Sequence, residues 1–259
     1  MQLFSLKLPL IKKNDPLLEI LIKKLNELDI ELKEKDIVVF SEKVIATSQG
    51  RVINLKDVKQ ISNKAKDLAK EYDMDERFVE LILQESSMIL GGMQHVILAK
   101  THDFLIANAG IDQSNAGLNN VVLLPSDLKT VVWDYWKILK NEFSVKDLGI
   151  LIADSRVQPL RVGTIGIAIA TAGFEPIEDC IGQPDLYNRH LEITKRAVAD
   201  DLASAAQFLL GEGNQQTPVV IIRDVNVEFT SNPQTKTEMA PEECLYMNIF
   251  ARYLQEKNQ

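Results

Sequence analysis

Cysteine is nearly absent from this chain of 259 residues, which contains only Cys180 and Cys244. The two lie far apart and outside any CxxC or histidine spacing, so the sequence favours neither a disulfide framework nor a zinc site. Long apolar runs are missing too, because no stretch approaches the roughly 18 apolar residues that a membrane span needs. The N-terminus also lacks the basic and apolar segments of a signal peptide. We therefore expect a cytoplasmic protein that does not span a membrane.

Positive charge is also scarce, since 29 Lys and Arg face 37 Asp and Glu, for a formal net charge of −8. A nucleic-acid partner would need a basic footprint, so this class of function is disfavoured. An anionic ligand would have to be bound locally, by a metal ion or a few basic groups. The Walker, GxGxxG and GxSxG motifs are absent, which removes the usual nucleotide-binding and hydrolase interpretations. The three histidines lie in unrelated contexts and are expected to be packing or surface residues.

Helical and strand patterns alternate along the chain, and hydrophobic residues make up 46% of it, enough for a large core. We expect an α+β (mixed α/β) fold with mixed sheets flanked by helices, in one domain over 1–259 or two interlocked subdomains. Strands are expected at 36–40, 95–100, 103–108, 148–153, 163–171 and 218–223. Helices are expected after Asp15-Pro16 and at 62–72, 75–89, 127–140 and 194–210, with a C-terminal helix at about 240–259.

The stretch Gly211-Glu212-Gly213 is the most informative local motif, because it places an acid between two glycines where a long apolar helix ends. Glycine allows backbone N–H groups to approach a ligand closely, and a carboxylate in the same turn can hold a hard cation. The motif is therefore suited to a metal-bound polyphosphate. The alternative is a glycine helix stop with a solvated glutamate.

Three acids, Asp112, Asp154 and Glu212, each follow an apolar strand or helix and sit among small residues. Carboxylates at strand ends can converge at one edge of a sheet, where magnesium ions could bridge the phosphates of a nucleotide. Ser155 would add a hydroxyl to such a site. Taken singly, each acid is more often an acidic loop residue or a helix cap.

Several ordered stretches together carry a resemblance: Leu8-Pro9-Leu10-Ile11, the segment 108–115, Asp154-Ser155 and the block from Pro184 to Gly213. They resemble the coenzyme F420-0:L-glutamate ligases, gamma-glutamyl ligases that extend a deazaflavin coenzyme. The similarity runs from the first strand to about Val227. It implies the fold of that family and an intertwined homodimer.

The resemblance also implies a ligase that uses GTP, or ATP, and two divalent cations, magnesium or manganese, with room for a monovalent cation. Asp112 and Asp154 would hold one divalent ion, and Ser155, where the family usually has threonine, would hold the other with Glu212. The three acids would thus be the catalytic residues. Nucleotide-contacting positions would be Leu8, Pro9, Leu10, Ile11, Ser41, Asn115, Leu210, Gly211, Glu212, Gly213, Asn214, Gln215, Gln216 and Thr217.

In this family the acceptor's terminal carboxylate attacks the γ-phosphate to give an acyl phosphate, which the amine of L-glutamate displaces. The chemistry is reasonable because a carboxylate acylates poorly until it carries a phosphate leaving group, and because metal ions reduce the repulsion between anions. The acceptor would be coenzyme F420-0 or, as in some bacterial relatives, a folate. Two further alternatives are a nucleotide-binding protein that has lost ligation and a metal-dependent phosphohydrolase.

Two departures from the family pattern flank the expected site. The family commonly reads Ser-Lys-Ala-Glu-Gly where this chain has 46–50, so Thr47 replaces a lysine and Lys43 could substitute only if the backbone turns differently. The usual Asp-Thr-x-Gly-Arg is Asp154-Ser155-Arg156-Val157-Gln158 here, and Arg156 could restore the lost charge. We interpret both changes as an altered preference for nucleotide or acceptor.

Overall fold

A computed structural model describes residues 1–250 of the chain, which form two compact units. The first unit contains Met1–Ile53, Gln113–Leu118 and Val122–Thr237, and the second contains Asn54–Asp112, Asn119–Val121 and, of the described residues after these, 238–250. The short strands β3 (Val52–Asn54) and β7 (Asn120–Val122) pair where the chain leaves the first unit and returns to it. Each unit has its own sheet.

A five-stranded mixed sheet in the order β1-β12-β2-β8-β9 forms the centre of the first unit. Its strands are β1 (Gln2–Leu6), β12 (Val219–Arg223), β2 (Asp36–Ser41), β8 (Leu148–Val157) and β9 (Thr164–Ala172). Only β2 and β8 run parallel, and the other neighbours are antiparallel. β2 is the middle strand and its first five residues are buried, as expected for a continuous apolar run with both faces covered.

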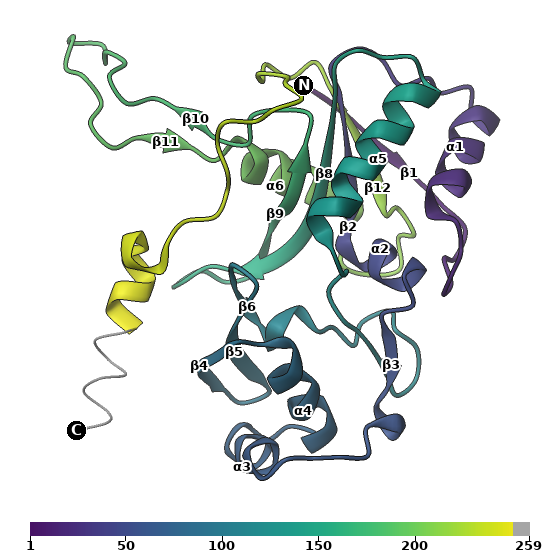
Figure 1. The fold of residues 1–259 in the computed structure, drawn as a ribbon, viewed down its shortest axis with the longest axis vertical. Coiled ribbons are helices and arrows are strands. Elements are labelled where there is room, and N and C mark those ends of the chain that lie inside the picture. The colour runs from purple at the N-terminus through teal and green to yellow at the C-terminus, as the bar shows by residue number, and fades with distance from the viewer. Residues whose placement is uncertain (251–259) are drawn as a thin grey trace. The chain divides into compact units, whose positions relative to one another are not determined.

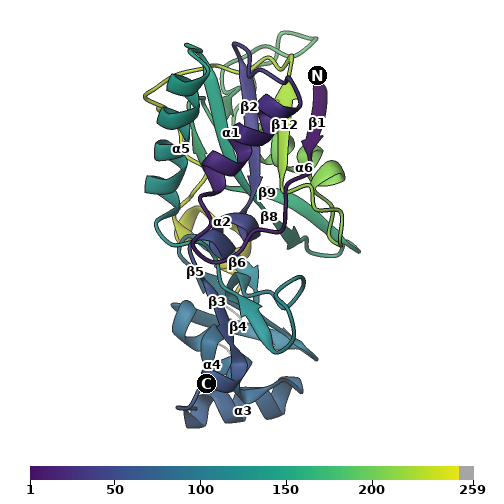
Figure 2. The same cartoon turned by 90° about the vertical axis from the view of Figure 1, so that its right-hand side faces the viewer.

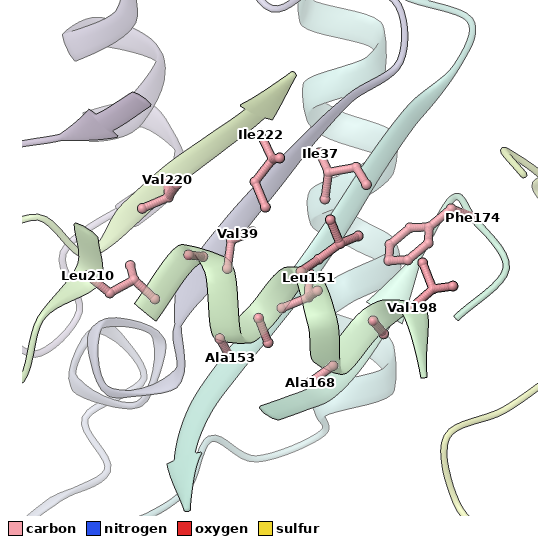
Figure 3. Close-up of a cluster of buried hydrophobic side chains, with 14 residues drawn as sticks. Ile37, Val39, Leu151, Ala153, Ala168, Phe174, Val198, Leu210, Val220 and Ile222 are labelled. Carbon is pink, nitrogen blue, oxygen red and sulfur yellow. The ribbon is translucent and has the colours of Figure 1, made fainter. Parts of the chain in front are cut away.

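Helices cover both faces of this sheet, with α6 (Val198–Leu210) on one side and α1 (Leu17–Glu27) and α5 (Leu128–Glu142) on the other (Figures 1 and 2). Beneath α6, side chains from four strands pack against the helix to form one apolar cluster (Figure 3). The cluster contains Ile37, Val39, Leu151, Ala153, Ala168, Val220 and Ile222. Residues 38 and 40 alternate with these along β2, and Phe40 meets Tyr135 of α5 on the opposite face.

The expected α+β class with sheets flanked by helices is confirmed, but some element boundaries differ from those predicted. α6 begins at Val198 rather than at 194, because Lys195–Arg196 form β11, which pairs with β10 (Glu178–Asp179). β8 continues to Val157 instead of ending at Ala153. A helix that the sequence did not predict, α2 (Glu42–Ser48), follows β2 directly and buries Val44, Ile45 and Ala46.

Between residues 54 and 112 the second unit has a three-stranded antiparallel sheet, β4-β5-β6, with the helices α3 and α4. Its elements are η1 (Leu55–Asp57), α3 (Asn63–Tyr72), α4 (Glu76–Glu85), β4 (Met88–Met93), β5 (Val96–Thr101), β6 (Phe104–Ala107) and η2 (Asn108–Gly110). α4 was predicted to reach 89, but it ends at Glu85 because the chain enters β4, a strand that the sequence did not reveal.

The C-terminal segment forms the short helix η3 (Pro241–Glu243) and is helical again over 245–250. The rest of the helix predicted for about 240–259 lies outside the described residues. Within 1–250, no helix is long and apolar enough to cross a membrane.

Candidate functional site

The loop after α6 is shaped by Gly211, which ends the helix with a φ of 69°. This backbone conformation favours glycine, and a Cβ here would also displace the Gln215 side chain, whose Cδ would lie 2.5 Å away. The Gln215 side chain folds back over the loop and accepts a hydrogen bond of 2.8 Å from the N–H of Gly213. The carboxamide oxygen of Gln215 therefore occupies the position from which an acceptor binds this backbone N–H.

Segments that are distant in sequence are hydrogen-bonded to this loop. The N–H of Leu8 donates to the carbonyl of Gln216 at 3.1 Å, and Nδ2 of Asn115 donates to the carbonyl of Gly213 at 2.9 Å. Immediately after the loop, the carbonyl of Pro218 accepts from the N–H of Ser41 at 2.9 Å. The structure thus brings together the four segments that were predicted to contact a nucleotide, and we call them the loop cluster: 8–11, Ser41, Asn115 and 210–217.

Glu212 lies exposed in this cluster and is held by two side chains. Its Oε1 accepts from Oγ1 of Thr164 at 3.0 Å and from Nε2 of Gln207. Thr164 is the first residue of β9 and Gln207 is in the last turn of α6, so the carboxylate is fixed by both elements. A carboxylate has about four acceptor sites, so two bonds to one oxygen leave capacity for a cation.

Asp154 and Ser155 lie inside β8, and not after its end as the sequence suggested. Because successive residues of a strand point to opposite faces, the two side chains are on opposite sides of the sheet. Ser155 pairs with Gly166, whose carbonyl accepts from Oγ of Ser204 in α6 at 2.8 Å. Ser155 is therefore on the face covered by α6, which is followed directly by the Glu212 loop.

Asp112 belongs to the second unit and follows an unusual turn. Asn108, Ala109 and Gly110 have φ values of 52°, 54° and 74°, so three consecutive residues are left-handed. Such a conformation is unfavourable for alanine, and backbone strain of this kind clusters at functional sites. Oδ1 of Asn108 supports the turn by accepting from the N–H of Ile97 at 2.9 Å. The convergence of Asp112 with Asp154 and Glu212 stays a prediction.

The donors in these positions fit magnesium or manganese, because carboxylate and hydroxyl oxygens are the ligands that hard cations prefer. Within residues 1–250, no three His, Cys, Asp or Glu side chains form a ready-made metal site. Magnesium is typically held by one or two carboxylates together with substrate phosphates and water, and not by a complete protein cage. A site divided between Asp154 on one side of β8 and Ser155 with Glu212 on the other is compatible with that mode.

The two departures from the family pattern have clear local structures. Arg156 lies beside Gln158, whose carboxamide oxygen can accept from Nη2 at 3.0 Å, so the residue that replaces the family's arginine pairs with Arg156. Thr47 is in α2, the helix that the sequence did not predict, and Lys43 is in the same helix. Nζ of Lys43 donates to Oγ of Ser114 at 2.9 Å, next to Asn115 of the loop cluster.

Three contacts of the site were not predicted from the sequence: those of Thr164, Gln207 and Lys43. Thr164 and Glu212 are 48 residues apart, and they meet because α6 packs against β9. The contact of Gln207 could have been found from the sequence, because Gln207 lies on the predicted helix and is five residues before Glu212. Lys43 required α2 to be recognised, and a short apolar run such as 44–46 is ambiguous between helix and strand.

Residues 5–224 match the protein family described as F420-0:Gamma-glutamyl ligase. The chain belongs to this family. The resemblance seen in the sequence is therefore confirmed, and the family is one of amide-forming ligases.

Archaeal proteins in this family are similar to the chain over most of their length. The coenzyme F420:L-glutamate ligase of Methanothermobacter thermautotrophicus is 37% identical over 217 residues, which cover 83% of this chain and 85% of the relative. The enzyme of the same name from Methanococcus maripaludis is 35% identical over 231 residues, covering 88% and 90% of the two chains. That of Methanosarcina acetivorans is 30% identical over 252 residues, covering 97% and 96%.

Proposed function

We propose that this gamma-glutamyl ligase family member uses a nucleoside triphosphate, GTP in the first instance, to join L-glutamate to the terminal carboxylate of an acceptor. The observation that carries the proposal is the loop cluster. Three backbone or side-chain amides, those of Leu8, Ser41 and Asn115, hold its segments together by hydrogen bonds. Within this cluster, the loop with Gly211 and Gly213 also carries the exposed carboxylate of Glu212, which Thr164 holds. This combination is suited to a metal-bound polyphosphate.

The reaction proceeds in two transfers. An oxygen of the acceptor carboxylate attacks the γ-phosphorus, the bond to the β-phosphate oxygen breaks, and an acyl phosphate and a nucleoside diphosphate form. The amine of glutamate then attacks the acyl carbon, inorganic phosphate leaves, and the amine loses a proton to give the amide. Both nucleophiles belong to substrates, so the chain needs only to orient them and to stabilise phosphate charge.

Residues of this chain would hold the two divalent cations that the family pattern implies: Asp112 and Asp154 for one, Ser155 and Glu212 for the other. Such ions neutralise the negative charge that builds up on transferring phosphate oxygens. Glu212 is already oriented by Thr164 and Gln207, which reduces the reorganisation needed on binding. Asp154 Oδ1 accepts from the N–H of Ser155 at 2.6 Å, which fixes the carboxylate against the strand.

For the acceptor we propose coenzyme F420-0, because the similar archaeal proteins are named coenzyme F420:L-glutamate ligases. A folate is the second candidate, and the observation in its favour is the changed strand end after Asp154. There Ser155, Val157 and Gln158 replace the usual residues, and Arg156 lies against Gln158. Both acceptors end in a carboxylate, so the same chemistry applies to either.

The decisive experiment incubates the protein with magnesium, glutamate, GTP or ATP, and either F420-0 or tetrahydrofolate, and follows the acceptor by mass spectrometry. We expect a mass increase of one or more glutamyl units with one acceptor, dependent on nucleotide and glutamate. Nucleotide hydrolysis without acceptor would instead identify a phosphohydrolase. Nucleotide binding with neither hydrolysis nor ligation would identify a protein that has lost the reaction.

We also propose that the chain forms a homodimer. The long connection between β10 and β11 forms an arm that extends away from the sheet of the first unit (Figure 1). Leu186, Tyr187 and Ile193 on this arm are 98%, 89% and 87% exposed, an unusual concentration of large apolar side chains for a monomer. Light scattering should give twice the chain mass, and Leu186→Asp should shift the protein toward the monomer. A monomeric unaltered protein would contradict the proposal.

A further inference from the structure

An exposed apolar surface lies beside the Glu212 carboxylate. Val157 is the last residue of β8 and pairs with Thr164, the residue that holds Glu212, so the side chains of Val157 and Thr164 are on the same face of the sheet. Beyond this pair, the connection between β8 and β9 presents Leu160 and Val162, both of which are fully exposed. Apolar side chains therefore begin next to Glu212 and continue into the connection.

Phe208 adds an aromatic ring to this surface. It lies one helical turn after Ser204, and residues four apart are neighbours on a helix. Because Oγ of Ser204 donates to the carbonyl of Gly166 in β9, Phe208 is on the side of α6 that faces this strand. The residue before it, Gln207, binds Glu212 through Nε2. Phe208 is nevertheless 91% exposed, so the described part of the chain leaves its ring uncovered.

Positive charge accompanies these apolar side chains. The segment 155–174 contains Arg156 and Arg161 and no acidic residue, in a chain whose net charge is −8. Arg156 lies beside Gln158, and Arg161 is exposed in the connection between the two strands. A surface that is both apolar and locally basic is complementary to a ligand with a conjugated ring and an anionic chain. Both acceptors considered above have this chemistry.

We propose that this surface binds the acceptor of the ligation reaction, and we call it the acceptor patch: Val157, Leu160, Arg161, Val162 and Phe208. Phe208 stacks on the conjugated ring, the aliphatic side chains cover its edge, and Arg161 pairs with an anionic group of the chain. The reactive carboxylate of the acceptor must lie near the cation proposed at Glu212, and the patch borders Glu212. This inference rests on the proposed ligase function and applies equally to coenzyme F420-0 and to a folate.

The test measures steady-state ligation at saturating magnesium, GTP and glutamate while the concentration of F420-0 or tetrahydrofolate is varied. Phe208→Ala and Arg161→Ala should each raise the KM for the acceptor about 10-fold with kcat unchanged, because both remove contacts made equally in the ground and transition states. The KM values for GTP and glutamate should change less than about two-fold. Phe208→Trp and Arg161→Lys, which keep an aromatic ring and a charge, should restore part of the affinity.

Lys137→Ala and Ile138→Ala are the matched controls. Both residues are exposed on α5, which covers the opposite face of the sheet from α6, and the changes remove one positive charge and one apolar side chain. Each control should keep the acceptor KM of the unaltered protein. An unchanged acceptor KM in either Phe208→Ala or Arg161→Ala, or an equal rise in the KM for GTP, would overturn the inference.

A second copy of the chain is the other occupant that suits an uncovered apolar surface. Leu160→Asp places a charge in the acceptor patch and distinguishes the two occupants when light scattering and ligation are measured together. A raised acceptor KM with the chain mass unchanged supports acceptor binding. A mass reduced to half that of the unaltered protein would assign the patch to a subunit interface and overturn the inference.

Calorimetric titration of F420-0 and of tetrahydrofolate without nucleotide separates this inference from the proposed function. Binding that Phe208→Ala weakens, in a protein that does not ligate, would support the patch and refute the ligase. Ligation with a normal acceptor KM in every patch variant would do the reverse. An effect on only one of the two compounds identifies the acceptor that the patch serves. Thermal unfolding verifies that each variant is folded, and Phe208→Trp provides the comparison if Phe208→Ala is unstable.

Discussion

The hydroxyl of Thr164 donates a hydrogen bond of 3.0 Å to Oε1 of Glu212. This contact joins the first residue of β9 to the loop that follows α6, two elements that also pack against each other through the Ala203 backbone and Gly166. The carboxylate is therefore oriented although it is exposed. An exposed acid with fixed geometry is suited to a ligand, because little ordering remains to be done when the ligand binds.

Glu212→Gln should abolish ligation while leaving the fold intact. The amide keeps the shape of the side chain but removes the charge that a divalent cation requires, so we expect turnover to fall at least about 100-fold. Because Glu212 is exposed, the change in unfolding free energy should stay within about 0.5 kcal/mol. Glutamyl transfer measured by mass spectrometry and urea unfolding give the two values.

The control for this variant is Thr164→Val, which removes the hydroxyl that orients Glu212 but keeps the carboxylate. Its activity should fall less than that of Glu212→Gln, and extra magnesium should recover part of it. Full activity in Glu212→Gln, or its unfolding, would show that the carboxylate does not serve a cation.

Gly166→Ala should destabilise the first unit, because a Cβ at Gly166 would lie 2.4 Å from the carbonyl oxygen of Ala203 in α6. Backbone atoms cannot move aside as the end of a flexible side chain can, so α6 must move away from β9. We expect this to lower the unfolding free energy by about 1–3 kcal/mol. Since Glu212 follows α6 by two residues, ligation should also weaken. Urea unfolding and the ligation assay measure the two effects.

Ser204→Ala is the comparison for that change, because it removes only the hydrogen bond from Oγ to the carbonyl of Gly166. It should cost about 1 kcal/mol and leave the helix in place. Equal stability of Gly166→Ala and the unaltered protein would contradict the close approach of helix and strand.

The sequence predicts those elements of the first unit that have one apolar helix face or one continuous apolar run. α1 follows from the helical spacing of Leu17, Leu18, Leu21 and Leu25, all of which are buried, and β2 follows from its continuous apolar run. Their pairing could not be predicted in this way. β2 lies between β12 and β8, and those contacts depend on residues more than 100 positions away.

The candidate site shows the same division. The Gly211-Glu212-Gly213 turn is local and was recognisable, because glycine conformations leave a sequence signature. The end of β8 was not recognisable from the sequence, because Asp154, Ser155 and Arg156 are polar and resemble a loop. Pairing with β9 keeps these residues in the strand. The face that Ser155 occupies depends on that pairing. The contact between Thr164 and Glu212 depends on the packing of α6 against β9.

Asp36→Ala should strongly destabilise the protein without acting on the loop cluster. Asp36 is fully buried and binds Arg223 through two hydrogen bonds, from Nε at 2.8 Å and from Nη2 at 2.7 Å. In the unaltered protein the hydrogen bonds with Asp36 raise the pKa of Arg223. The guanidinium stays charged in the variant as well, because the ordinary pKa of arginine is already far above neutral pH. Leaving that charge without its partner should cost about 2–4 kcal/mol, somewhat reduced because Arg223 is 18% exposed.

Urea unfolding tests this prediction against two other variants. The double change Asp36→Val with Arg223→Leu should recover most of the loss, because apolar residues of similar volume can replace a buried ion pair. Glu27→Ala, which breaks the exposed pair between Lys24 and Glu27, should cost less than about 1 kcal/mol. A small effect of Asp36→Ala, similar to that of Glu27→Ala, would contradict a structural role for the buried pair.

Tyr135→Phe should change how stability depends on alkaline pH. Burial raises the pKa of Tyr135 from 10.0 to about 12, opposed by a side-chain hydrogen bond with Ser48, and its ring packs against Phe40 at 5.1 Å. Between these two pKa values the unfolded chain loses the phenol proton while the folded chain keeps it. The unfolded state then binds fewer protons, so stability falls as pH rises through this window, by at most about 1.4 kcal/mol per pH unit.

Phenylalanine has no ionisable proton, so the unfolding free energy of Tyr135→Phe should lack this part of the decline with rising pH. Below pH 10 the difference in unfolding free energy between the two proteins should be constant, and above it the variant should gain relative to the unaltered protein. Urea unfolding at a series of pH values from neutral to about 11 measures this difference, in which other titrating groups cancel. Parallel curves for the two proteins would show that Tyr135 ionises alike in the folded and unfolded chains, and that burial does not hold its proton.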